Sequence, residues 1–254
     1  MIRHGKSDLT KASLKRDVYF TAKQVTYIRN KILRQMEVPE DSPQEWSLSP
    51  YDPNQLIDKL PRVELKPSYT LNAYLYRSGA NGNGVIRAEN KDATPSMPEW
   101  NRYPGNAYPL KEESGTEKYV VHALELDGSA RSYLTATLLE KECQEYGALW
   151  HGVDWEVHHI IDDIETGNKP RNIDETTLIE PEWMRSMNWQ NRRSHTFDPV
   201  VKHLSSNTVL VQFYTYSELG EQAIYRHRDR FNKKTGDFKT ETVVIAKGAG
   251  GFVF

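Results

Sequence analysis

The residues best suited to chemistry are crowded between Trp150 and Asp163. Within 13 residues lie three of the eight histidines and four carboxylates: His151, Asp154, Glu156, His158, His159, Asp162 and Asp163. Histidine changes its protonation near neutral pH and binds metals, and carboxylates orient imidazoles or bind hard cations. This segment is therefore the first candidate for a catalytic or metal site.

The local geometry of this segment decides which side chains could act together. If residues 154–161 form a strand, alternate side chains point to opposite faces. Asp154 and His158 would then share a polar face, while His159 would point toward the apolar side with Val157.

Two interpretations of this cluster are open. The tripeptide His158-His159-Ile160, followed after a Gly-Asn-Lys loop by Asn172-Ile173, resembles the opening of the HNH, or ββα-metal, nuclease motif. The resemblance implies that His159 is the general base that activates water and that Asn172 fixes the loop. It also implies a divalent metal held by a later His or Asn, and the candidates for this site are His158, Asp162 and His195, with Asn188 and Asn191 as other possibilities for the later member.

The second interpretation is structural. One of His158 and His159 would be a buried, hydrogen-bonded imidazole and the other a surface imidazole, with Asp162 and Asp163 in the following turn. Structural ion pairs also gather titratable groups, so such a cluster does not need a metal or a substrate.

A second candidate site is a stripe of arginines near the C-terminus. In a strand predicted for residues 222–231, alternation places Arg226, Arg228 and Arg230 on one face. Such a stripe either binds phosphates or is a solvated face that pairs with Glu241 across the next turn.

The elements that must position these residues predict an α+β fold, with an N-terminal helix plus a curved antiparallel sheet or partial barrel. Thr21 and Gln24 form a capping-box signature before a helix predicted at 21–36. Alternating patterns predict a hairpin over 68–89, a strand from Tyr119 to Leu126, and a meander of three strands at 208–216, 222–231 and 238–246. Residues 131–146 fit a strand or a strand-to-helix transition, and 183–189 fit a short helix that packs on the sheet.

Charge and proline content suggest the domain organisation. Residues 1–36 hold nine basic and two acidic residues, against 24 and 33 in the rest of the chain, and ten of the 13 prolines fall between Pro39 and Pro109. We expect a basic arm at 1–20 and a single domain at 21–254 with an extended proline-rich segment at 39–109. The arm either binds a polyanion such as nucleic acid or folds back on the acidic body.

Several function classes have no support in the sequence. Nucleophile-elbow, dinucleotide, Walker and His-Glu-x-x-His signatures are absent, and the lone Cys143 stands among carboxylates that blunt a thiol nucleophile. No apolar run is long enough to span a membrane, and a single cysteine favours a reducing cytoplasm.

The first functional hypothesis is a binding or assembly module. A curved sheet forms a cup, and side chains such as Tyr214, Tyr216 and Tyr225 would receive a ligand, a protein partner or a second copy of the chain. The alternative is the metal-dependent phosphodiesterase acting on nucleic acid, and only that alternative needs a divalent metal as cofactor.

Overall fold

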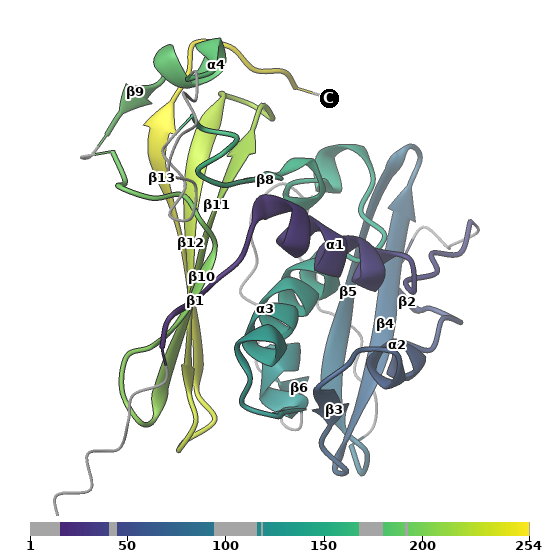
Figure 1. The fold of residues 1–254 in the computed structure, drawn as a ribbon. Coiled ribbons are helices and arrows are strands. Elements are labelled where there is room, and N and C mark those ends of the chain that lie inside the picture. Colours follow the sequence, from purple (N-terminus) through teal and green to yellow (C-terminus); the bar gives the residue numbers. More distant parts are fainter. Residues whose placement is uncertain are drawn as a thin grey trace, which may run out of the picture.

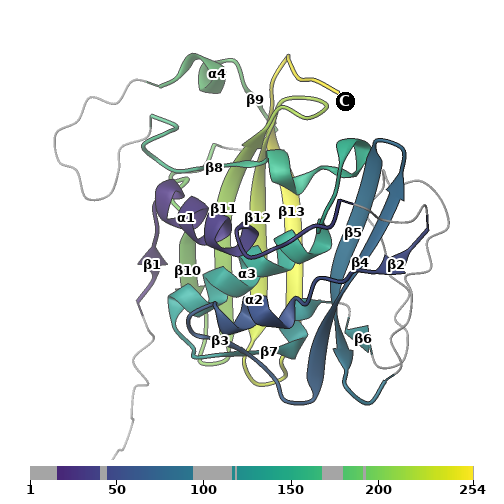
Figure 2. The same cartoon turned by 90° about the vertical axis from the view of Figure 1, so that its right-hand side faces the viewer.

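A computed structural model describes residues 16–40, 45–93, 116–117, 119–167, 180–190 and 193–253. A layer of helices lies between two antiparallel sheets (Figures 1 and 2). None of the helices in these described ranges is long and apolar enough to cross a membrane.

The larger sheet, sheet A, curls into an antiparallel half-barrel and confirms the predicted α+β fold with a curved sheet. Its strands run in the order β1-β10-β11-β12-β13-β9, and β8 also pairs with β11. The bounds are β1 (Val18–Tyr19), β8 (His159–Ile161), β9 (Asn188–Trp189), β10 (Val200–His203), β11 (Thr208–Ser217), β12 (Ala223–Asn232) and β13 (Phe238–Lys247). The three long strands are the predicted meander, which is confirmed.

Sheet B carries the predicted hairpin. Its strands are β2 (Ser47–Leu48), β4 (Tyr69–Ser78), β5 (Asn81–Asn90) and β6 (Thr116–Glu117), and a separate pair joins β3 (Val63–Leu65) to β7 (Leu124–Leu126). Gly79, at a φ of +60°, makes the turn between β4 and β5. Gly84 lets β5 approach the backbone at Tyr146, because a Cβ at Gly84 would stand 2.1 Å from the Tyr146 carbonyl oxygen.

The N-terminal helix confirms the capping-box prediction. Helix α1 (Ala22–Leu33) begins after Thr21, whose hydroxyl accepts from the Gln24 amide while the Gln24 side chain accepts from the Thr21 amide. The helix ends three residues before the predicted boundary. In the proline-rich segment the described helix is short, α2 (Asn54–Asp58), and follows Pro53.

Residues 131–146 are where the sequence prediction was wrong. They form a helix, α3 (Ala130–Gln144), capped by the Ser129 hydroxyl, and not a strand or a strand-to-helix transition. The helix lies between sheets A and B (Figure 1), so it is buried on nearly all sides and lacks the single apolar stripe of a surface helix. Thr135 and Thr137 are buried with their neighbours, and their alternation with apolar residues imitated a strand.

Two further strand predictions were wrong in part. Residues Val120–Ala123 form a 3₁₀ turn, and only Leu124–Leu126 continue as β7. Likewise Trp155–Val157 form a 3₁₀ turn, and only His159–Ile161 are extended as β8. A 3₁₀ turn does not alternate its side chains, so the faces expected for residues 154–161 do not hold.

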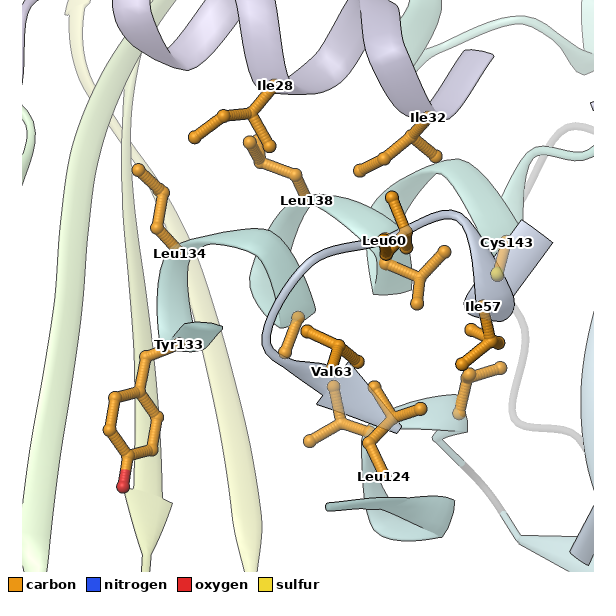
Figure 3. Close-up of a cluster of buried hydrophobic side chains, with 14 of the residues drawn as sticks. Ile28, Ile32, Ile57, Leu60, Val63, Leu124, Tyr133, Leu134, Leu138 and Cys143 are labelled. Carbon is orange, nitrogen blue, oxygen red and sulfur yellow. The ribbon is translucent and has the colours of Figure 1, made fainter. Parts of the chain in front are cut away.

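Sheet A separates two apolar cores. On its inner face Val211 and Phe213 belong to one core with α1, α3 and the segment around Leu60 and Val63. Figure 3 shows side chains of α1, α3 and that segment meeting in this core. On its outer face Tyr214 packs with Met184, Met187 and Phe197. The short helix predicted at 183–189 is shorter in the structure: α4 (Glu182–Arg185) carries Met184, whereas Asn188–Trp189 form β9. The outer core covers one end of the sheet, where α4 lies (Figure 1).

The proposed basic arm lies largely outside the described residues. Of its last residues, Val18 and Tyr19 form β1, which pairs with Val201 and Val200 of β10 at the edge of sheet A. The division into an arm at 1–20 and a single domain at 21–254 stays a prediction.

Candidate functional site

A hollow on the described surface opens between the end of β11, α4 and the C-terminal tail. These elements lie at one end of sheet A (Figure 1). The volume of the hollow is about 720 Å³. Segments far apart in the sequence contribute its lining residues: Val157, His159, Glu165, Trp183, Tyr216, Ser217, Glu218 and Phe252. We call this hollow the end pocket.

One wall of the end pocket is aromatic. The rings of Trp183 and Tyr216 pack with their centroids 4.6 Å apart and their planes at 36°. Trp183 reaches this position because Pro181 starts α4 and the neighbouring Met184 is buried in the outer core, which fixes the orientation of the short helix. Tyr216 stands near the end of β11, where alternation turns it to the same outer face as Tyr214.

Glu218 follows the end of β11 and bonds the phenol of Tyr216. The Tyr216 hydroxyl donates to Glu218 Oε1 at 2.6 Å, and the Gln222 side-chain amide donates to the same oxygen at 3.1 Å. Burial, with the hydrogen bond to Glu218 and its charge, raises the pKa of Tyr216, so the phenol keeps its proton. Both donors are neutral, and the charge of Glu218 is not cancelled by either.

His159 and Glu165 form the polar side of the end pocket. His159 pairs with Tyr216 in the β8–β11 register, its side chain is 63% exposed, and its Nε2 lies 3.0 Å from Glu165 Oε2. The hydrogen bond to Glu165 raises the pKa of His159, although partial burial opposes the shift. This pair is an imidazole held by a carboxylate at the pocket rim.

Asp162 builds the turn that presents Glu165. Its Oδ1 accepts from the backbone amides of Ile164 and Glu165 at 3.0 and 3.1 Å, and its Oδ2 accepts from the Ala22 amide at the start of α1 at 2.8 Å. All three bonds satisfy backbone donors, so Asp162 joins the turn to the helix.

The C-terminal tail closes the pocket with Phe252. The Phe252 amide donates to the Glu218 carbonyl at 2.8 Å, and the Gly220 amide donates to the Phe252 carbonyl at 2.6 Å. Gly251, at a φ of +142°, makes this approach because a Cβ there would stand 1.9 Å from the Gly220 carbonyl oxygen. The tail therefore forms a short parallel bridge between Leu219 and Phe252.

His158, by contrast, faces the inner core. Its Nδ1 lies 2.7 Å from the Thr215 hydroxyl, which lies 2.8 Å from His227 Nε2, and His227 Nδ1 lies 3.1 Å from the Thr242 hydroxyl. Burial lowers the pKa of His227, so this chain contains a neutral imidazole at neutral pH. Of the pair, His158 is buried and His159 is exposed, and the expected apolar orientation of His159 was wrong.

The three candidate metal ligands have different surroundings in the structure. His158 bonds Thr215, Asp162 bonds backbone amides, and His195 is exposed after residues that the structure does not describe. In the described ranges no group of three or more His, Cys, Asp or Glu could hold a metal ion. Asn172 and Asn191 lie outside the described residues, whereas Asn188 is exposed in β9. The metal and catalytic assignments of the nuclease hypothesis stay predictions.

The predicted binding residues divide between two places. Tyr216 lines the end pocket, while Tyr214 is buried in the outer core with its hydroxyl 3.0 Å from Ser194 Oγ. The arginine stripe, Arg226, Arg228 and Arg230, occupies the outer face of β12 and does not line the pocket. Arg228 donates to Gln212 at 2.8 Å and lies 3.9 Å from Glu241, the partner that the solvated-face interpretation predicts.

Six of the eight pocket residues were not among the sequence candidates: Val157, Glu165, Trp183, Ser217, Glu218 and Phe252. The signal available for Glu218 was its place two residues after Tyr216, at a strand end. Trp183 and Trp189 flank Met184 and Met187, so the sequence favoured a core role for this segment, and the two methionines are indeed buried.

The chemistry of the end pocket follows from its lining. Of the described residues that form it, two are carboxylates, three are aromatic and none is Lys or Arg. Comparisons with protein-family models, curated proteins and solved structures find no match.

Proposed function

We propose that the protein binds a small organic molecule in the end pocket. The single observation that carries this proposal is the convergence of aromatic faces and polar side chains from four separated segments on one hollow of about 720 Å³. Small-molecule sites are concave, of roughly 300–1,000 Å³, and largely apolar with a few placed polar groups.

The expected affinity is modest because the hollow is open. A ligand of about 20 heavy atoms that gains about 0.3 kcal/mol per atom binds with about 6 kcal/mol, which is a Kd in the tens of micromolar. Binding at this level is visible to ligand-observed NMR.

The test is a fragment screen by ligand-observed NMR on the full chain. The wild type is compared with Trp183→Ala, which removes one aromatic wall, and with Trp150→Ala, which removes an exposed tryptophan outside the pocket. We expect a set of fragments that lose binding in Trp183→Ala and keep it in Trp150→Ala. Absence of any fragment with this behaviour, in protein that is folded, contradicts the proposal.

A nuclease site centred on His159 is the second candidate function. The observation that favours it is an imidazole that is 63% exposed and held by a carboxylate 3.0 Å away. A general base needs both access to its substrate and a partner that fixes its orientation. The corresponding assay is given among the predictions below.

A further inference from the structure

We propose that the ligand of the end pocket is an organic cation, an ammonium or guanidinium group carried on an apolar body, with Glu218 as its counter-charge. This inference rests on the proposed function and names the ligand class for the same site.

The first support is the charge of the lining. Glu218 bonds only the Tyr216 phenol and the Gln222 amide and has no basic partner among the described residues. The nearby ammonium of Lys247 is paired with Glu221. A carboxylate with neutral donors at the rim of an apolar hollow attracts a cation and repels an anion.

The second support is the position of the aromatic rings. The Tyr216 hydroxyl donates a 2.6 Å hydrogen bond to Glu218, and the Trp183 ring packs against the Tyr216 ring. A cation within about 6 Å of such a ring face is attracted by the ring quadrupole. Because the phenol donates a hydrogen bond to a carboxylate, electron density on the ring rises and this attraction strengthens. One bound cation can thus meet an aromatic face and a carboxylate together.

The third support is the histidine at the rim, which makes the pocket charge depend on pH. Glu165 at 3.0 Å and Asp162 are the charged groups that face His159, and they favour its protonated form. Protonated His159 neutralises Glu165, and neutral His159 leaves that carboxylate charged. The pocket therefore becomes more negative as the pH rises through the titration of His159, and cation binding strengthens in the same direction.

The test uses three probes that share one body: 3-phenylpropylamine, 3-phenylpropan-1-ol and 3-phenylpropanoate. Each is titrated by NMR into wild type, Glu218→Gln and the matched control Glu221→Gln, whose residue lies outside the pocket lining. We expect the amine to bind wild type about tenfold more tightly than the alcohol. Glu218→Gln keeps an oxygen acceptor for Tyr216 and should reduce the amine to the level of the alcohol, while Glu221→Gln should not.

The pH arm is independent of the choice of probe body. Between pH 6 and pH 8.5 the amine affinity of wild type should rise, and that of His159→Gln should stay flat. Equal binding of amine and alcohol, tighter binding of the propanoate, or an unchanged amine affinity in Glu218→Gln overturns the cation inference.

The fragment screen separates this failure from failure of the proposed function. If Trp183-dependent fragments exist but the amine has no advantage over the alcohol, the pocket binds ligands and only the ligand class is wrong. If no fragment depends on Trp183, both proposals fall.

Discussion

Arg29 of α1 connects the inner core to the segment that carries His158 and His159. Its guanidinium donates to Glu142 Oε1 of α3 at 2.7 Å, to the His158 carbonyl at 2.8 Å and to the Trp155 carbonyl at 3.0 Å. It also lies 4.6 Å from the centre of the Trp155 ring. The side chain is 9% exposed, and that of Glu142 is 4% exposed, so this is a buried ion pair.

Replacing Arg29 by Met keeps most of the apolar stem and removes the guanidinium. Glu142 would then be a buried charge without its cation, and the backbone carbonyls of Trp155, Glu156 and His158 would lose the donor that Arg29 supplies. Removal of one partner of a buried ion pair costs about 3–5 kcal/mol of unfolding free energy. This is a large part of a total stability of about 5–15 kcal/mol.

The matched variant is Glu142→Gln, which removes the charge but can still accept from the Trp155 indole that bonds Glu142 at 2.6 Å. In the double variant no buried charge is left unpaired. We expect it to be more stable than the sum of the two single losses predicts by about 1–3 kcal/mol. Urea unfolding at pH 7.5, followed by circular dichroism and tryptophan fluorescence, measures all three. A loss below about 1 kcal/mol for Arg29→Met, or additive losses in the double variant, would refute the reasoning.

Three further predictions concern single side chains. Burial raises the pKa of Glu140 to about 7, so its folded form keeps a proton that the unfolded chain releases near pH 4.5, and stability falls as the pH rises between these values. The unfolding free energy of Glu140→Gln relative to that of wild type should therefore increase by about 3 kcal/mol as the pH rises from 5 to 8, measured by urea unfolding. Parallel pH profiles of the two proteins would contradict this. Lys239 faces Arg230 directly across strands β12 and β13, and neither has an ion pair among the described residues. Lys239→Glu should therefore raise the unfolding free energy by about 0.5–1 kcal/mol. An equal gain from the turn variant Lys234→Glu would refute a cross-strand cause. If the nuclease hypothesis holds, plasmid nicking with Mg²⁺ or Mn²⁺ is lost in His159→Ala; absence of nicking by folded wild type removes the hypothesis.

Local signals in the sequence were enough for much of the fold. The capping box at Thr21 and the alternation of 208–246 depend on neighbours in the chain, and both predicted the observed elements. Helix α3 was missed because it is covered by a sheet on each side, and burial all round erases the periodicity that marks a helix. Arg29 gave no sequence signal because its partners lie more than 100 residues away.

The site was only partly predictable for the same physical reason. Tyr216 and His159 were candidates from their own residue types, and the β8–β11 register brings them together. The predicted orientation of the histidines was wrong because Trp155–Val157 form a 3₁₀ turn, in which side chains do not alternate between two faces as they do in a strand. Glu218 and Phe252 are brought together by backbone hydrogen bonds of the C-terminal tail, which no local sequence pattern predicts.

The most direct test of the end pocket as an organic-cation site observes Trp183 itself. The protein is labelled with 5-fluorotryptophan, the ¹⁹F signal of Trp183 is assigned with Trp183→Phe, and 3-phenylpropylamine is titrated in beside 3-phenylpropan-1-ol. We predict a saturable shift of the Trp183 signal with the amine at concentrations where the alcohol has little effect. A folded protein in which the Trp183 signal stays unmoved by saturating amine contradicts the assignment.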